Sequence, residues 1–259
     1  MTPLPSPLTA DAAWQQLHAA ACAPYRQAGL FAWHWARGKL GRDPVFLGLL
    51  SRGELPAHAR VLDIGCGQAL LASLLQACAD LQAAGRWPQA WPVAASARSY
   101  TGIELMATDL ERGQRALAGI ALAPQLLCAD MRSQALPPCD VVVILDVLHY
   151  VNHDEQEAVL RRVVQALQPS GRLLLRVGDA ASRRGFAISQ WVDRVVTGVR
   201  GHRVAPTWGR SLGDWQALLA RLGLSLVNAV PQSQGTPFAN VLLVAQLKNS
   251  ASGVRGSRA

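Results

Sequence analysis

The stretch RVLDIGCGQALLASLL, from Arg60 to Leu75, combines a carboxylate with a glycine-rich turn. An apolar run enters the turn, and a leucine-rich segment with helical spacing leaves it. Gly65 and Gly67 let a ligand approach the backbone closely, and such turns usually bind phosphate. Asp63, however, stands two residues before the first glycine. Its charge would repel a pyrophosphate and favour a cationic ligand. The stretch therefore indicates a positively charged ligand without phosphate.

A dinucleotide site fits this turn poorly. Leu70 stands where the motif G-x-G-x-x-G needs its third glycine, and Glu104 follows Gly67 by 37 residues (104 − 67). A dinucleotide fold places that acidic residue roughly 20 residues on. A loop inserted at 85–100, rich in Pro, Trp and Ala, accounts for the excess. S-adenosylmethionine (SAM) carries a sulfonium and an ammonium group and no phosphate, so SAM is the expected cofactor. A nicotinamide oxidoreductase is disfavoured.

Further acidic residues end the strands that follow. Glu104 is expected to accept hydrogen bonds from the ribose hydroxyls, as an acidic residue at this place does for nucleosides. Asp130 is expected to accept from the adenine amino group, with Met131 packed on the ring. Asp146 ends a buried strand and opens DVLHYV, where methyl donor and acceptor would meet.

These residues need a fold that brings strand ends together. Apolar patterns indicate strands at 100–104, 125–130, 139–146, 172–177, 224–230 and 240–247 and helices at 109–120, 153–171 and 211–223. Helix-like segments fill roughly the first fifty residues. The alternation predicts an α/β fold with a doubly wound, mostly parallel sheet and helices on both faces. In such a sheet the ligand binds at the carboxyl ends of the strands, where their order reverses.

In order, VLDIGCG, GIE, AD, VVVILDVLHYV and LQPSGRLLLRV resemble the class I SAM-dependent methyltransferases, over about residues 60–247. The resemblance implies a seven-stranded Rossmann-like sheet with an antiparallel C-terminal hairpin strand. It places the methionine part of SAM at Asp63, Gly65, Cys66 and Gly67. It also assigns ribose to Glu104 and adenine to Asp130 and Met131. The chain departs from the family pattern in its long insertion before Tyr100.

The nucleophile that accepts the methyl group is less well defined. His149 lies just past Asp146 and is a candidate general base for a hydroxyl acceptor, since its ordinary pKa is near neutrality. The alternative is that His149 and Tyr150 only shape the pocket wall. His34 is a weaker candidate base. The whole chain also resembles small bacterial methyltransferases that accompany aryl-polyene or lipid-like biosynthesis. That resemblance implies a phenolic or acyl acceptor, either free or attached to an acidic carrier protein.

Two segments are candidates to cover the acceptor. Residues 25–46 interleave aromatic residues with Arg and His, including His34 and Arg37. They read as a helical lid, as an amphipathic helix packed on the sheet, or as a surface that docks on an anionic membrane. Residues 181–203 carry Trp191 among apolar and arginine positions, with solvated helix arginines as the alternative. The expected division is a lid at 1–59, a SAM-binding core at 60–247 and a disordered basic tail at 248–259.

Composition limits the function further. Half of the 259 residues are hydrophobic and 16% are charged, which excludes bulk disorder. The net charge is +8, and nearly all of the basic residues are arginines. This charge permits an anionic partner, or it reflects a genome-wide bias towards arginine. The five cysteines lack metal-ligand spacing, so no metal is expected, and free thiols favour a cytoplasmic location. A small-molecule acceptor is expected. RNA methylation and a non-catalytic SAM-binding scaffold remain alternatives, and nucleic acid is disfavoured because no RNA-binding module is visible.

Overall fold

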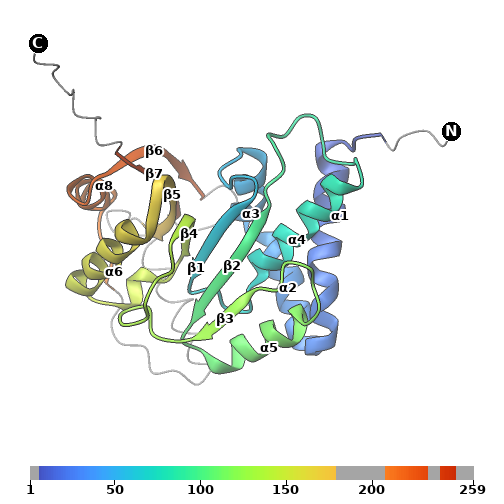
Figure 1. The fold of residues 1–259 in the computed structure, drawn as a ribbon, viewed down its shortest axis with the longest axis horizontal. Coiled ribbons are helices and arrows are strands. Elements are labelled where there is room, and N and C mark those ends of the chain that lie inside the picture. The colour runs from blue at the N-terminus through green and yellow to red at the C-terminus, as the bar shows by residue number, and fades with distance from the viewer. Residues whose placement is uncertain (1–5, 179–207, 233–239, 249–259) are drawn as a thin grey trace, which may run out of the picture.

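The computed structural model describes residues 6–178, 208–232 and 240–248. Seven strands form one sheet in the order β3-β2-β1-β4-β5-β7-β6, with helices on both of its faces (Figure 1). The strands are β1 (Ala59–Ile64), β2 (Ala97–Glu104), β3 (Gln125–Cys128), β4 (Cys139–Leu145), β5 (Leu167–Gly178), β6 (Leu224–Pro231) and β7 (Asn240–Leu247). Strand β7 pairs antiparallel with β5 and β6, and the other pairings are parallel. The expected fold class is confirmed.

The helices follow the expected alternation closely. They are α1 (Ala10–Cys22), η1 (Ala23–Ala28), α2 (Leu30–Arg42), α3 (Pro44–Ser51), α4 (Leu70–Ala83), α5 (Ala107–Leu117), η2 (Leu148–Tyr150), α6 (His153–Ala166) and α8 (Leu212–Arg221). One boundary differs from expectation. Helix α6 ends at Ala166, a few residues before Pro169 and Gly171, which the sequence predicts as its end. Pro169 disfavours helical backbone at the residue before it, and Leu167 already starts β5.

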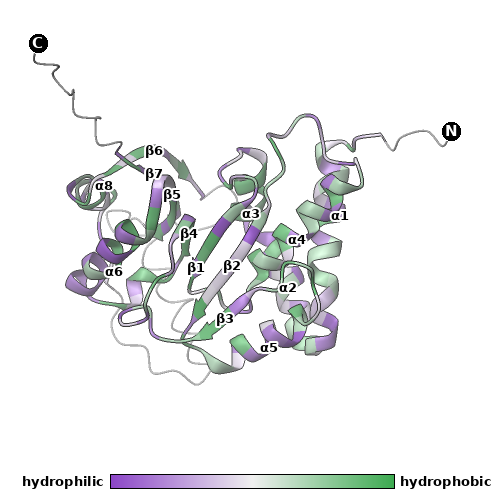
Figure 2. Ribbon diagram, in the orientation of Figure 1, coloured by the Kyte–Doolittle hydropathy of each residue, from purple (hydrophilic) through white to green (hydrophobic). Residues whose placement is uncertain are grey.

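The central strands bury both of their faces. Along β4, Val141 and Val143 pack into the core beneath α1–α5, whereas Val142 and Ile144 pack into the core beneath α6 and α8. This period of two is the strand geometry that puts successive side chains on opposite faces. Figure 2 shows hydrophobic colour along the central strands and more hydrophilic colour on α5 and α6. Burial on both faces explains why β4 reads as one continuous apolar run.

The N-terminal helices are part of the first of these cores. Leu17 of α1, Tyr25 of η1 and Leu40 of α2 are buried in the same cluster as Leu74 and Leu75 of α4. The segment expected as a lid therefore contributes buried residues to the core on one face of the sheet. Whether part of it also covers an acceptor stays a prediction.

The Trp-rich insertion lies at the amino ends of the parallel strands, whereas the glycine turn lies at their carboxyl ends. It connects the end of α4 to the start of β2 at Ala97, and therefore adjoins the amino ends of the parallel strands. Trp87 packs edge-on against Trp91 and donates a hydrogen bond from Nε1 to the Pro92 carbonyl oxygen at 2.8 Å. The extra residues between Gly67 and Glu104 therefore lie away from the carboxyl ends of the strands, where the ligand is expected to bind.

Candidate functional site

The glycine turn between β1 and α4 has backbone that ordinary residues adopt with strain. Gly65 has φ +76° and Gly67 has φ +55°. A Cβ atom on Gly65 would lie 2.1 Å from Cγ2 of Val147, the residue that follows Asp146. A Cβ atom on Gly67 would lie 4.0 Å from Cη2 of Trp35 on α2. The turn therefore lies between the end of β4 and a side chain of the N-terminal helices.

Asp63 lies at the second-to-last position of β1, buried beneath this turn. It pairs with Gly102 of β2 and Val143 of β4 in the sheet register. The Tyr100 hydroxyl donates a hydrogen bond to Asp63 Oδ2 at 2.5 Å. Burial raises the pKa of Asp63 to about 7, against the effect of the Tyr100 hydrogen bond, and the charge of Glu104 raises it further. A cation bound at this edge would stabilise the ionised carboxylate.

Glu104, at the end of β2, reaches the glycine turn across the sheet. Its Oε2 accepts a hydrogen bond from the Gly67 N–H at 2.9 Å, and its Oε1 accepts from the Met106 N–H at 2.9 Å. Each carboxylate oxygen keeps a further lone pair for a ligand hydroxyl. Between Glu104 and Met106, the Leu105 side chain is 64% exposed. An apolar side chain this exposed beside the glycine turn offers a surface to a planar ring.

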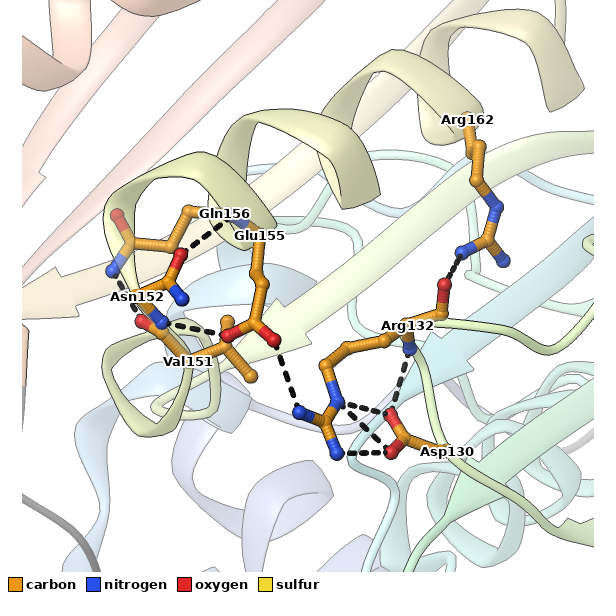
Figure 3. Close-up of polar contacts among 7 residues, drawn as sticks. All are labelled: Asp130, Arg132, Val151, Asn152, Glu155, Gln156 and Arg162. Atoms are coloured by element: carbon orange, nitrogen blue, oxygen red, sulfur yellow. Dashed lines mark hydrogen bonds and ion pairs between the residues drawn. The ribbon is translucent and has the colours of Figure 1, made fainter.

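Asp130 follows β3 and is already paired with Arg132 (Figure 3). Arg132 donates from its backbone N–H, its Nε and its terminal nitrogen, at 2.7–3.1 Å from the two carboxylate oxygens. The Arg132 hydrogen bonds hold the pKa of Asp130 below its usual range, against a smaller effect of burial. Met131 is partly buried against the second core. Asp130 is therefore an ionised acceptor of fixed orientation.

Asp146 follows β4 with φ +58°, a left-handed backbone that a non-glycine residue adopts only with strain. Its carboxylate pairs with Arg176 of β5, whose side chain is only 4% exposed. Arg176 also donates to both oxygens of Asp43, at 2.5 and 2.8 Å. Burial opposes the charge on Asp43, but Arg176 and Lys39 hold its pKa well below the usual range. This ionic network joins α3 to the ends of β4 and β5.

His149 lies in η2, three residues past Asp146. Its ring is half-buried and stacks at a tilt on Tyr150, with ring centroids 4.1 Å apart. The Trp208 N–H donates to the His149 carbonyl oxygen at 2.8 Å, which attaches the segment before α8 to this turn. The structure thus puts His149 on the loop that also contacts Gly65 through Val147. Its role as a base stays a prediction.

The remaining predicted residues lie farther from these contacts. His34 is exposed and packs on the Trp33 ring, and the exposed Arg37 guanidinium lies 4.8 Å from the same ring. The α2 residue that approaches the glycine turn is Trp35. Cys66 packs its sulfur against Gly102, and its thiol donates to the Gly67 carbonyl oxygen at 3.8 Å. Burial raises the pKa of this thiol. Trp191 lies outside the described residues. For His34, Arg37 and Trp191 an acceptor role stays a prediction.

Asp63, Glu104 and both glycines lie together at the carboxyl ends of β1 and β2. Asp130 and Asp146 follow β3 and β4, the strands on either side of this pair. Sequence reasoning included Trp35 only as one of the aromatic residues of the expected lid, and it missed four residues here: Tyr100, Leu105, Arg132 and Arg176. Two of them carried a signal. Leu105 is apolar directly after an acidic strand end, and Arg176 interrupts the buried run LLLRV. These hydrogen-bond acceptors fit SAM, because carboxylates at neighbouring strand ends suit hydroxyl, amino and cationic groups.

Comparison with known proteins supports this assignment. Residues 32–229 match a family model described as a methyltransferase domain. The chain is 29% identical over 183 residues to mitomycin biosynthesis 6-O-methyltransferase of Streptomyces lavendulae, covering 70% of this chain and 46% of that protein. It is 27% identical over 255 residues to trans-aconitate 2-methyltransferase of Methylobacterium nodulans, covering 76% of this chain and 90% of that protein. It thus spans about half the length of the first relative and most of the second.

The solved structures with the same fold include magnesium protoporphyrin IX methyltransferase from Synechocystis with bound S-adenosylhomocysteine (SAH). That match has a TM-score of 0.55 at 18% identity and covers 92% of this chain and 99% of the other. An O-methyltransferase family 2 protein from Planctomyces limnophilus, in complex with apigenin, has a TM-score of 0.58 at 14% identity, over 86% and 62% of the two chains.

Proposed function

Because the chain belongs to the methyltransferase-domain family and is a class I SAM-dependent methyltransferase, we propose that it methylates an oxygen of a small-molecule acceptor. The observation that carries the cofactor assignment is the buried Asp63 carboxyl beneath the glycine turn, whose raised pKa a bound cation would lower. The acceptor is proposed to be a phenolic or lipid-like, polyketide-type compound. A relative named as a 6-O-methyltransferase supports transfer to oxygen.

The chemistry is a direct displacement for which the cofactor would supply a methyl group on a sulfonium, with the neutral thioether as the leaving group. The protein's contribution is to align the acceptor with that methyl group and to exclude water. In this proposal Asp63 and the glycine turn hold the methionine part, Glu104 the ribose, and Asp130 the adenine. Asp146 and its loop form the floor on the acceptor side. His149 takes the acceptor proton, if the acceptor ionises during transfer.

Calorimetry with SAM, SAH and NADH tests the cofactor site. We expect SAM and SAH to bind and NADH to fail. Asp63→Ala and Glu104→Ala should each weaken SAM binding at least about tenfold, or about 1.4 kcal/mol, because each removes a buried or hydrogen-bonded carboxylate. Asp80→Ala is the matched control, since Asp80 is exposed on α4 and bonds Gln76. Binding of NADH alone, or unchanged SAM affinity in both variants, would refute the site.

Transfer of radiolabelled methyl into fractions of a cell extract, followed by mass spectrometry, tests the acceptor class. We expect label in a small molecule with an added O-methyl group, and we expect it to persist after RNase treatment. Loss of the label with RNase would favour RNA methylation. Tight SAM binding without transfer to any fraction would favour a non-catalytic scaffold.

His149→Ala tests the base. We expect methyl transfer to slow by about a hundredfold, the lower end of general base effects, while SAM affinity stays within about twofold. If His149→Ala transfers methyl at the wild-type rate, His149 is not the base and only shapes the wall of the pocket, the alternative reading of the sequence.

Partners and location are proposals as well. Among the described residues, no helix has the length and apolarity to span a membrane. Leu30 and Phe31 are strongly exposed at the start of α2, and the Arg112 guanidinium lies 4.5 Å from the Phe31 ring. This apolar and basic tip suits peripheral contact with an anionic membrane or with an acidic carrier protein that presents the acceptor. A cytoplasmic location fits the free cysteines.

A further inference from the structure

Tyr100 of β2 is a buried tyrosine whose hydroxyl meets the Asp63 carboxylate of β1. In the sheet register Tyr100 lies beside Val61, and Asp63 lies beside Gly102. Because side chains alternate along a strand, Val61 and Asp63 point to the same face, and the Tyr100 ring packs in the core on that face. Gly102 has no side chain, and the Tyr100 hydroxyl reaches Asp63 Oδ2 diagonally across the two strands, at 2.5 Å.

The Tyr100 hydroxyl is a proton donor to this carboxylate. Burial holds the pKa of Tyr100 well above its ordinary value, so the hydroxyl keeps its proton. A carboxylate that accepts a hydrogen bond is stabilised in its ionised form. Burial of Asp63 and the charge of Glu104 act in the opposite sense and favour the neutral acid. The ionisation of Asp63 therefore depends on a balance in which the Tyr100 hydroxyl favours the charged form.

The other groups that interact with Asp63 supply no positive charge. Cys66 lies in the glycine turn and Tyr25 lies in η1, and burial raises the pKa of each well above its ordinary value, so both are neutral at pH 7. Glu104, at the end of β2, adds a negative charge. In the part of the chain that the structure describes, no cation contributes to the pKa of Asp63. Within that part, the Tyr100 hydroxyl is therefore the contact that supports the ionised carboxylate.

We propose that Tyr100 is a positioning residue, whose hydroxyl orients the Asp63 carboxylate beneath the glycine turn and keeps it ionised for a cationic cofactor. Tyr100 acts through Asp63 and lies 37 residues from it in the chain, outside the glycine motif. This role rests on the cofactor site proposed above. A tyrosine that only filled the core would contribute equally to SAM binding at every pH. A tyrosine that keeps Asp63 ionised contributes most at neutral and acidic pH, where the carboxyl can take up a proton.

Calorimetry with SAM at pH 7 and pH 9 tests this role in the wild-type protein and in Tyr100→Phe, which keeps the ring and removes only the hydroxyl. We expect the midpoint of the pH dependence of SAM affinity to move upward by about one pH unit, because a hydrogen bond to a charged group is lost. Tyr100→Phe should then bind SAM about fivefold more weakly than the wild type at pH 7, and less than about twofold more weakly at pH 9. Titration of SAM itself cancels in this ratio.

Tyr25→Phe is the matched control, because it removes a second buried hydroxyl close to the turn. That hydroxyl donates to the Gln68 carbonyl oxygen at 2.7 Å and not to Asp63. Any loss of SAM affinity in Tyr25→Phe should therefore be the same at both pH values. In an Asp63→Asn background, Tyr100→Phe should produce no pH-dependent change, since no carboxyl remains to be ionised.

Urea unfolding at both pH values shows whether each variant is folded. An equal loss of affinity at both pH values in Tyr100→Phe, or no loss at either, would overturn the role proposed for Tyr100. A Tyr100→Phe protein without a cooperative transition would also overturn it, because the hydroxyl would then serve the fold. The same holds for a pH-dependent loss in Tyr25→Phe. Failure of the wild-type protein to bind SAM at either pH would instead refute the cofactor site itself.

Discussion

Asp63 makes the proton balance of cofactor binding measurable. Its pKa is about 7 in the free protein, so the carboxyl is about half protonated at neutral pH. A cationic ligand favours the ionised form, and binding should therefore release a proton below pH 7. We predict that SAM affinity falls about tenfold between pH 8 and pH 6, by linkage with a pKa near 7. Calorimetry in buffers of different ionisation enthalpy measures both the affinity and the proton.

The same residue affects the stability of the free protein. The folded pKa lies above the usual value of 3.8, so the folded state binds more protons between about pH 4 and pH 7. Stability from this group should be present at low pH and be lost as pH rises through 7. Asp63→Asn should remove both pH dependences. A wild-type SAM affinity that does not change with pH would contradict the assignment of a cation to Asp63.

At the residue scale, the sequence predicts which acids end the strands but not their neighbours. Asp63, Glu104 and Asp130 could be found because strand ends follow from apolar runs. Tyr100 could not be assigned to Asp63, because its hydroxyl partner depends on the register between β1 and β2. Arg132 is two residues from Asp130, but only the turn geometry decides that its side chain folds back.

At the scale of elements, the charged network at Arg176 connects pieces that the sequence leaves unrelated. Asp43 and Arg176 are 133 residues apart, and no local pattern predicts that they meet. The strands and helices themselves were predictable, because burial on one or two faces leaves a period of 3.6 or a continuous run. Contacts between elements depend on how α2 and α3 cross the sheet, which no periodicity encodes.

Breaking this network should be costly. Asp43→Asn keeps an oxygen to cap α3, where Asp43 Oδ1 accepts from the Val45 N–H at 3.1 Å. It leaves the buried Arg176 with Asp146 alone, and loss of a partner from a buried ion pair costs about 3–5 kcal/mol. We predict destabilisation of that order in urea unfolding. Lys39→Met removes only the partly exposed partner of Asp43 and should cost less than about 1 kcal/mol. Equal effects would mean that Arg176 is solvated.

At the scale of the molecule, the sequence suggests a lid at 1–59 on a separate core, while the buried contacts describe a shared core. Leu17, Tyr25 and Leu40 pack with Leu74 and Leu75 of α4 in one cluster. The Tyr25 hydroxyl also donates to the Gln68 carbonyl oxygen at 2.7 Å, directly after the glycine turn. The N-terminal helices thus contact the chain at the turn itself, and the division into a lid at 1–59 and a core at 60–247 stays a prediction.

Removal of residues 1–59 tests which description holds. Each buried Leu or Tyr lost from this cluster removes about 1.5–3 kcal/mol, so a handful of them approaches the whole stability of a domain, about 5–15 kcal/mol. We predict that the fragment 60–259 gives no cooperative unfolding transition and no SAH binding. Removal of 249–259 serves as the control and should leave both unchanged. A fragment 60–259 that unfolds cooperatively and binds SAH would show that the helices are a separable lid, because the glycine turn would then keep its shape without Tyr25.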